Sequence, residues 1–186
     1  LVRAGRCQRV LVLAGENRAS GQSRDGAIQT LAQVGDADFE VPNGASVPAY
    51  YALLASRYLH EHGLSEADLA EFAVLMRHHA ASHPDAQLSA PITVADVLAS
   101  KPIASPLKLL DCCPISDGGA ALIVSSAPRG PRIALRGAGQ AHLHQHLTAM
   151  SSVLECGAGV AAQRAFDASG LRLADIDLLA IYDSFT

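Results

Sequence analysis

The alternation of short apolar runs with segments of helical spacing is the feature that most constrains this chain. The runs RVLVLAG at residues 9–15 and AALIV at residues 120–124 have the length and the β-branched content that are typical of buried strands. Residues 132–136 and 177–185 are the two further strands that we expect. Strands that alternate with helices build α/β layers, so the sequence predicts an α/β fold.

The predicted helices begin and end at recognisable signals. Four are expected, at residues 48–62, 65–83, 93–99 and 159–169. Gly63 and Gly170 stand where helices commonly end. Two pairs resemble capping boxes, Ser65 with Asp68 and Thr93 with Asp96. The side chains expected to form apolar stripes are Tyr51, Leu54, Tyr58 and Leu59, and then Leu69, Phe72, Leu75, Met76 and His79. Residues 16–48 show little periodicity and are expected to be loop.

Composition excludes several classes of protein. The 186 residues include 14 Lys+Arg against 18 Asp+Glu, and this balance excludes a broadly basic nucleic-acid-binding surface. Hydrophobic residues make up 49% and charged residues 17%, which argues against disorder. No apolar run approaches the roughly 20 residues of a membrane span, and the first residues lack a secretory signal. We therefore expect a soluble cytoplasmic protein with no nucleic-acid partner and no membrane span.

The two ends of the chain are unusual for a natural domain. The chain begins at Leu1 without an initiator methionine, and it stops at Thr186 directly after an apolar run. Natural domains more often end in a polar, fraying segment. We therefore expect an internal piece of a longer protein.

Six histidines fall into two groups whose spacing suits a metal site: His78, His79 and His83, and His142, His144 and His146. In a strand the second group would point to one side, and zinc accepts neutral imidazole nitrogen. Neither group has a well-placed carboxylate, and the alternative for the second is a polar loop after Gly137 and Gly139. We expect no metal site.

Three other features carry chemistry only in the right context. Cys156 precedes a predicted helix, whose N–H groups lower a thiol pKa, but an inert residue at a tight turn is the reading that we favour. The pair Gly137-x-Gly139 follows a predicted strand but lacks the third glycine of a dinucleotide-binding fingerprint. Tyr182 lies at the C-terminal end of a predicted strand, where α/β sheets bind ligands and where a tyrosine can transfer a proton. From these residues alone, a packing role for Tyr182 is the stronger reading.

Three segments together resemble one family. SPLKLLDCCPISDGGAALIV at residues 105–124 resembles the segment that closes the first half of the thiolase fold, in the Asp-Cys-Cys-Pro form of sterol-carrier-protein-type (lipid-transfer) thiolases. RVLVLAGENRAS at residues 9–20 resembles the strand and turn that follow the nucleophile helix. IYDSFT at residues 181–186 resembles the second-half motif that is Asn-Glu-Ala-Phe in degradative thiolases and His-Asp-Cys-Phe in sterol-carrier types. The stretches HHAASHPDAQ and PITVADVLASKPI also fit the lipid-transfer branch.

The resemblance implies a thiolase-like fold of two similar α/β halves with mixed sheets and layered helices, only partly covered by this chain. Residues 1–28 would end the first half, and residues 29–104 would form the inserted loop domain. Residues 105–128 would be the closing strand of the first half, and residues 131–186 would start the second. The Pro- and Gly-rich linker predicted at residues 127–131 agrees with this division.

The same resemblance implies C–C bond cleavage or formation on a 3-oxoacyl-CoA or 3-hydroxyacyl-CoA, in lipid or steroid side-chain metabolism. Coenzyme A would be a cosubstrate, no cofactor would stay bound, and the parent protein would be a homodimer. The family's nucleophilic cysteine would precede Leu1, and its Gly-His-Pro histidine and second cysteine would follow Thr186. We therefore expect these 186 residues alone to be inactive as a thiolase.

Two residues receive roles from the resemblance. Tyr182 stands where family members carry the Asn or His of the oxyanion site, and a tyrosine hydroxyl can donate to an oxyanion. The branch with this Tyr-Asp-Ser-Phe form includes thiolase-like aldolases that work with a DUF35-type (OB-fold and zinc-ribbon) partner, with tyrosine as the acid/base of retro-aldol cleavage. Cys113 would line the pantetheine channel. A non-catalytic acyl-CoA-binding subunit is the alternative from a different class.

Overall fold

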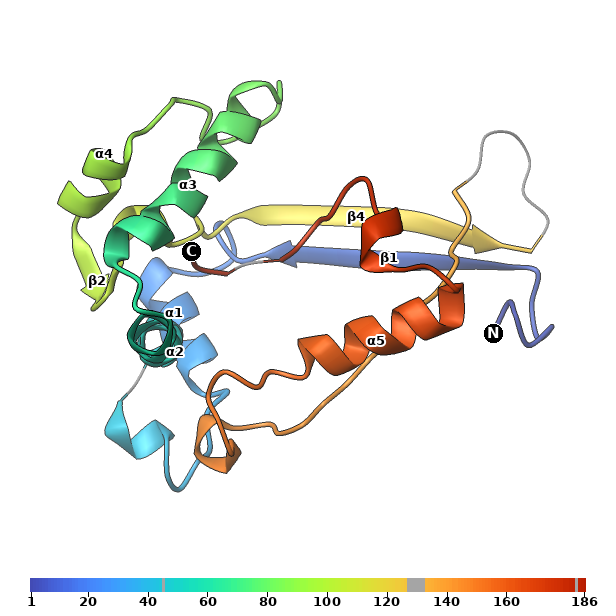
Figure 1. The fold of residues 1–186 in the computed structure, drawn as a ribbon, viewed down its shortest axis with the longest axis horizontal. Helices are drawn as coiled ribbons and strands as arrows, with labels where there is room; N and C mark the ends of the chain where they lie inside the picture. The colour runs from blue at the N-terminus through green and yellow to red at the C-terminus, as the bar shows by residue number, and fades with distance from the viewer. Residues whose placement is uncertain (45, 127–132, 183) are drawn as a thin grey trace.

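The computed structural model describes residues 1–44, 46–126, 133–182 and 184–186, apart from the side chain of Arg24. The helices and strands along the chain are β1 (Arg9–Asn17), α1 (Arg24–Ala32), α2 (Val47–His62), α3 (Glu66–Ala81), α4 (Val94–Ala99), β2 (Pro102–Ala104), β3 (Leu107–Lys108), β4 (Asp117–Ser125) and α5 (Ala158–Ser169) (Figure 1). The described residues thus contain both helices and strands, and the α/β class is confirmed. No helix in the described part of the chain is both long and apolar enough to cross a membrane.

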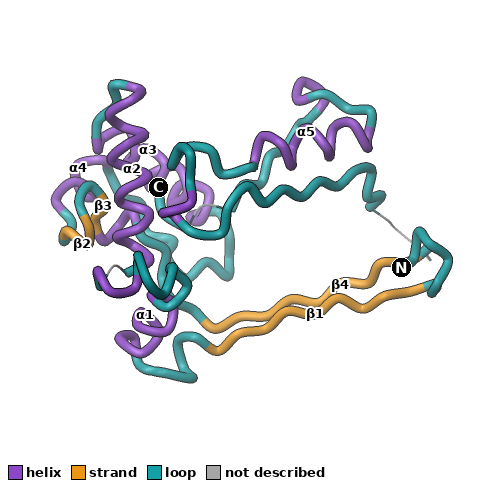
Figure 2. The backbone as a smooth tube through the Cα atoms, turned by 90° about the horizontal axis from the view of Figure 1, so that it is seen from below, coloured by secondary structure: helices purple, strands orange, loops and turns teal. Residues whose placement is uncertain are grey.

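The strands β1 and β4 form a long antiparallel ribbon (Figure 2). Its register runs from Arg9 opposite Ser125 to Asn17 opposite Asp117. At one end, an oxygen of the Asp117 carboxylate accepts the N–H groups of Ala19 at 2.7 Å and Ser20 at 3.1 Å. This carboxylate therefore fixes the turn that follows β1 to the start of β4.

The expectation that these two strands are buried is wrong. The side chains of Leu11 and Leu13 are 59% and 69% exposed, and Ile123 of β4 is 67% exposed. A two-stranded ribbon cannot bury its faces unless another layer packs on each of them. The expected strands are present, but the ribbon leaves apolar side chains on both sides exposed.

The helices α2, α3 and α4, together with the short β2–β3 hairpin, form a separate cluster at the other side of the molecule (Figure 1). Their ends follow the predicted signals. Gly63 ends α2 with a left-handed backbone (φ 62°), and the Ser65 N–H donates to the Asp68 carboxylate at 2.7 Å. At the start of α4, Thr93 donates to Asp96 and accepts from its N–H. The predicted caps are confirmed.

Small side chains make the contacts between these helices. One core cluster contains Ala52, Leu69 and Leu107, and the other contains Ala70, Ala73 and Val97. The predicted stripes are therefore only partly right, because Tyr51, Tyr58, Phe72, Leu75 and Met76 are each at least 40% exposed. Alanines allow helices to approach closely, so the larger side chains lie beside the contact.

The structure corrects three further expectations. Residues 16–48 are not all loop, because they contain α1, which Ser23 caps by accepting the Gly26 N–H at 3.1 Å. Within the described residues, 133–136 and 177–182 pair with no other strand. A strand needs a hydrogen-bonding neighbour, and here only Phe185 finds one, in a single bridge to Cys112. The predicted linker at residues 127–131 lies outside the described residues.

An extended segment leads from residue 133 to residue 140 along helix α5. A Cβ atom added at Gly139 would lie 1.9 Å from the carbonyl oxygen of Ala161, and one at Gly137 would lie 2.2 Å from that of Ala165. The Gly-x-Gly pair therefore allows the backbone to pack directly on the helix. The guanidinium of Arg164 holds the same segment by donating to the carbonyl of Gln140.

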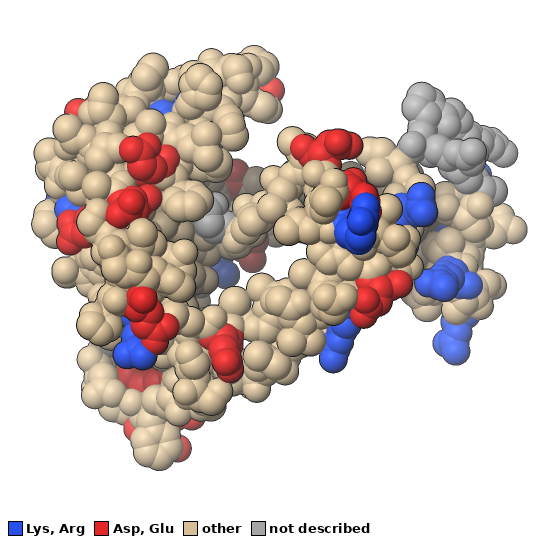
Figure 3. Space-filling view, in the orientation of Figure 1, with Lys and Arg blue, Asp and Glu red and all other residues tan. Residues whose placement is uncertain are grey.

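Most of the molecular face in Figure 3 carries uncharged side chains, in line with the 17% of charged residues in the sequence. Charged groups on this face stand singly or in small groups between uncharged ones (Figure 3).

Replacing Gly139 with alanine should destabilise the α5 region, because the new methyl group would overlap the helix backbone at Ala161. We expect a loss of about 1–3 kcal/mol in the free energy of unfolding, measured by urea denaturation. Gly118→Ala is the matched control, since a Cβ at Gly118 has no atom within 4 Å. Equal stability of the two variants would contradict this packing.

The stability of the protein should fall in acid partly through Asp117. Hydrogen bonds from the Ser20 hydroxyl and from the N–H groups of Ser20 and Ala19 lower the pKa of Asp117. A lowered pKa contributes stability that is present above the unfolded pKa of about 3.9 and is lost as pH falls through the folded value. Urea melts at pH 5 and pH 3 should show a smaller loss in Asp117→Asn than in the wild type. An unchanged loss in Asp117→Asn, as expected for the control Asp85→Asn, would contradict this role.

Candidate functional site

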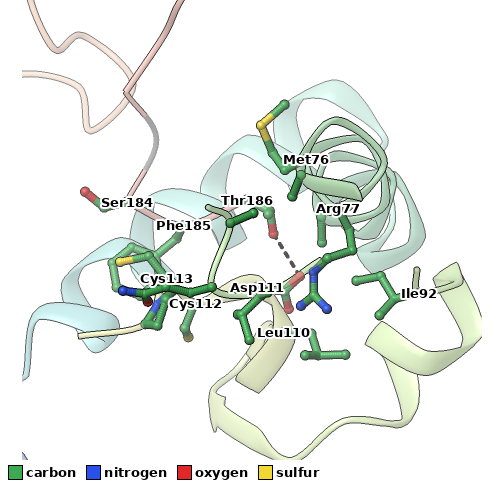
Figure 4. A pocket seen from close by; sticks show the side chains of 16 residues that line it. Met76, Arg77, Ile92, Leu110, Asp111, Cys112, Cys113, Ser184, Phe185 and Thr186 are labelled. Atoms are coloured by element: carbon green, nitrogen blue, oxygen red, sulfur yellow. Dashed lines mark hydrogen bonds between the residues drawn. The ribbon is translucent and has the colours of Figure 1, made fainter. Parts of the chain in front are cut away.

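The candidate site is a cavity of about 320 Å³ beside helix α3 (Figure 4). Two segments that lie 70 residues apart in the sequence meet at its wall, residues 110–114 and residues 184–186. The second half of α3, residues 86–88 and Ile92 complete the lining. The DCCP and YDSFT motifs, which the sequence singled out separately, therefore come together at one place.

Asp111 joins these two segments. Its side chain is only 5% exposed, and its two carboxylate oxygens accept the Thr186 hydroxyl at 2.8 Å and the Lys108 N–H at 2.7 Å. The Thr186 N–H also donates to the Asp111 carbonyl at 3.1 Å, next to the bridge between Cys112 and Phe185. A buried carboxylate needs such hydrogen-bond donors, and these bonds fix Thr186 beside Asp111.

Aromatic packing adds to this attachment. The ring of Phe185 lies 4.6 Å from that of Tyr51 on α2, measured between centroids. Phe185 also packs against the core cluster that contains Leu107. The terminal motif is thereby fixed to both α2 and the DCCP loop.

The two adjacent cysteines of the DCCP loop have different surroundings. The Cys112 thiol is partly buried and donates to the Lys108 carbonyl at 3.2 Å. Cys113 is exposed, although both cysteines line the cavity. Neighbouring residues of an extended backbone point to opposite sides, which explains the difference. The structure thus places Cys113 at a cavity, while its role toward pantetheine stays a prediction.

Tyr182 lies outside this cavity. Its side chain is 89% exposed, whereas Ser184, two residues later, lines the wall. Asp183, which stands between them, lies outside the described residues. The structure therefore brings residues 184–186 to the cavity without bringing the Tyr182 hydroxyl into it, and the acid/base role of Tyr182 stays a prediction.

Sequence reasoning missed Arg77, the residue of α3 that carries a positive charge into the cavity wall. Its Nη1 atom donates to the Ala90 carbonyl at 3.0 Å. Arg77 follows Ala73 by four residues and so continues the buried face of α3 that begins with Leu69 and Ala70. The signal in the sequence that could have identified Arg77 was a cation on the same helical face as the apolar residues.

The histidines of the second group have separate partners. His142 lies 2.8 Å from the Gln140 amide, and His144 lies 2.7 Å from the Glu155 carbonyl. Their segment is not a strand, so the predicted alignment of three imidazoles does not occur. Among the residues that the structure describes, no three His, Cys, Asp or Glu side chains are grouped so that they could hold a metal.

The third histidine of that group, His146, lies near a buried carboxylate. Its Nδ1 atom is 3.9 Å from Glu40, which is 6% exposed. Burial acts to raise the pKa of Glu40, but N–H groups of Thr148, at 2.7 Å, and Asp36, at 2.9 Å, donate to the carboxylate, and the net effect lowers its pKa. Glu40 therefore ties residues 146–148 to the segment before α2.

Cys156 has the position that the sequence predicts, directly before α5 and next to Gly157, whose backbone is left-handed (φ 76°). Its thiol is exposed and lies outside the cavity beside α3. The favoured reading of Cys156 as a residue at a tight turn fits this geometry.

Replacing Asp111 with alanine should release residues 184–186 from the cavity wall. The Thr186 hydroxyl and the Lys108 N–H would lose their acceptor, which costs about 1–3 kcal/mol for a buried group. Hydrogen exchange at the Thr186 amide should become faster in this variant. Asp175→Ala, which removes an exposed partner of Arg172, is the control. Unchanged exchange in Asp111→Ala would show that other contacts hold the segment.

Comparison with known proteins relates this chain to one family. A model described as "Thiolase C-terminal domain-like" matches residues 139–186. The chain is 31% identical to an acetyl-CoA acetyltransferase of Methanocaldococcus jannaschii, over 86% of this chain and 43% of the relative. It is 38% identical to a steroid side-chain-cleaving aldolase of Thermomonospora curvata, over 78% of this chain and 40% of the relative.

A solved structure agrees with these relatives. The chain resembles a chain of an Ltp2-ChsH2(DUF35) aldolase with a TM-score of 0.75 and 33% identity, over 94% of this chain and 48% of that one. The chain thus spans less than half the length of these relatives, and the expected thiolase-like fold, covered in part, is confirmed. This chain belongs to the thiolase superfamily, in the branch of the sterol-carrier-protein-type thiolases and the steroid side-chain-cleaving aldolases.

Proposed function

We propose that the protein acts on acyl-CoA thioesters and makes or breaks a C–C bond in the acyl chain. The observation that carries this proposal is the cavity at which the DCCP loop meets the YDSFT segment. Both motifs resemble segments of the thiolase superfamily, and in this structure Asp111 connects them through its hydrogen bond with Thr186. As part of this proposal, the four parts of the thiolase fold expected from the sequence also apply to the parent protein. They are residues 1–28, 29–104, 105–128 and 131–186.

The lining of the cavity suits the arm and acyl chain of a thioester. Met76, Ile92, Leu110 and Phe185 supply apolar surface, and Cys113 adds a small, polarisable side chain. Ligand sites are commonly apolar with a few polar groups that fix orientation. We assign Cys113 to the pantetheine arm and coenzyme A to the role of substrate carrier, with no resident cofactor.

The reaction that we favour is retro-aldol cleavage of a 3-hydroxyacyl-CoA. A base takes the proton of the 3-hydroxyl group, the bond between carbons 2 and 3 breaks, and carbon 3 leaves as a carbonyl compound. The electron pair passes to carbon 2 as a thioester enolate, which then takes a proton and becomes a shortened acyl-CoA. Tyr182 is the group of this chain that we assign to the proton transfer.

Two comparisons favour cleavage of this kind. The relative with 38% identity is a steroid side-chain-cleaving aldolase, and the solved structure is an aldolase that contains a DUF35 protein. We therefore propose a DUF35-type OB-fold partner for the parent protein, in a homodimeric and cytoplasmic enzyme.

Thiolytic cleavage is the second candidate, favoured by the 31% identity to an acetyl-CoA acetyltransferase. In that reaction an enzyme cysteine attacks the 3-oxo carbon, and free coenzyme A then accepts the acyl group. One coenzyme A is consumed for every bond cleaved, whereas retro-aldol cleavage consumes none. A non-catalytic acyl-CoA-binding subunit would bind the thioester without either reaction.

The Tyr182→Phe variant tests the favoured reaction in the full-length protein with its DUF35-type partner and a 3-hydroxyacyl-CoA. We expect kcat to fall by about 10²–10⁴-fold while KM changes little, because only proton transfer is lost. Release of the carbonyl product is measured by chromatography, and free thiol is titrated to detect any consumption of coenzyme A.

Tyr58→Phe is the matched control, because Tyr58 packs on His62 within α2 and belongs to neither the DCCP loop nor the YDSFT segment. Full activity of Tyr182→Phe would contradict the assigned proton transfer. Consumption of one coenzyme A per bond cleaved would show thiolysis instead, and binding of the thioester without turnover would show a non-catalytic subunit.

A further inference from the structure

Arg77 is the residue of the cavity wall whose chemistry the proposed reaction does not use. Among the described residues that line the cavity, it carries the positive charge and Asp111 carries the negative charge. Figure 4 shows the Arg77 guanidinium between α3 and the side chains of Leu110 and Ile92, on the same side of the cavity as Asp111. Arg77 as a whole is half-buried, and its guanidinium, whose hydrogen bond to the Ala90 carbonyl is exposed, stays accessible from solvent.

Most of the hydrogen-bonding capacity of Arg77 is unused within the described part of the chain. A guanidinium has five N–H donors, and the contact with the Ala90 carbonyl occupies one nitrogen. No carboxylate of the described residues forms an ion pair with Arg77, and Asp111 already accepts from Thr186 and Lys108. A partly buried cation without a counter-charge favours an anion from outside the chain.

The surroundings limit the class of anion. A guanidinium binds carboxylate and phosphate groups through two parallel N–H contacts. The neighbouring side chains of Met76, Ile92 and Leu110 are apolar, so they suit a ligand whose anionic group is attached to an apolar or thioether-like chain. A small inorganic anion would leave this apolar surface uncovered.

We propose that Arg77 binds a carboxylate or phosphate group carried on the chain of the ligand that occupies this cavity. The identification of that ligand as an acyl-CoA rests on the proposed function. Two sources then share the chemistry, a carboxylate on the acyl group and a phosphate of coenzyme A. Arg77 thereby selects ligands by charge at a point separate from Tyr182.

The first experiment compares octanoate with octanol, which share an apolar chain and differ in charge. Calorimetry on the purified protein should show that octanoate binds about 10- to 100-fold more tightly, the range of a hydrogen bond to a charged group. Arg77→Gln should remove this preference and Arg77→Lys should retain part of it. Arg57→Gln is the matched control, because Arg57 is an exposed arginine of α2 that pairs with Glu61.

Binding of octanol, which has no charge, shows whether Arg77 has only a structural role. If the contact with the Ala90 carbonyl only shaped the cavity, Arg77→Gln would weaken octanol and octanoate equally, and the proposal would be overturned. It would also be overturned if the wild-type protein showed no preference for octanoate. Loss of the preference with octanol binding intact supports it.

The second experiment identifies the source of the anion with succinyl-CoA, butyryl-CoA and their dephospho forms. If Arg77 binds an acyl carboxylate, the wild-type protein prefers succinyl-CoA to butyryl-CoA and Arg77→Gln does not. If it binds the 3′-phosphate, Arg77→Gln weakens butyryl-CoA but not its dephospho form. If no thioester binds while the octanoate preference persists, the proposed function fails and the anion site at Arg77 stands.

Discussion

The hydrogen bonds of Asp111 are the interaction on which the candidate site depends. A carboxylate that is 5% exposed accepts the hydroxyl of Thr186 and the N–H of Lys108, so one buried side chain connects segments 75 residues apart. Because an unpaired buried carboxylate is costly, this arrangement favours a single position for the end of the YDSFT motif. This connection places the end of the motif at the cavity, which Cys113 and Arg77 also line.

Close backbone approach is the second constraint, and small residues provide it. Ala52, Ala70 and Ala73 allow the helices of the cluster to pack, and Gly139 allows the chain to lie directly on α5. The long β1–β4 ribbon differs from both, since its apolar side chains remain exposed. The part of the molecule that surrounds the cavity is therefore the part with a buried core.

Local signals made much of this structure predictable. The ends of α2, α3 and α4 depend on residues within one turn, such as Gly63 and the pair Thr93 and Asp96, and they follow the prediction. Contacts between distant residues were not predictable in the same way. The partner of Asp111 lies at Thr186, and the strands expected at 133–136 and 177–182 depend on neighbours that the spacing of their own residues does not specify. The resemblance of the motifs indicated the family, whereas the cavity and the place of Arg77 in its wall follow only from the three-dimensional structure.

Protection of cysteines by a thioester tests the central claim most directly, because the chain contains its own control. Cys113 and Cys156 are both exposed, but only Cys113 lines the cavity. Alkylation by N-ethylmaleimide depends on access to the thiol and is followed at each cysteine by peptide mass spectrometry. Saturating butyryl-CoA should slow the modification of Cys113 and leave that of Cys156 unchanged. Unchanged modification of Cys113, or equal protection of both cysteines, would contradict the assignment of this cavity to acyl-CoA.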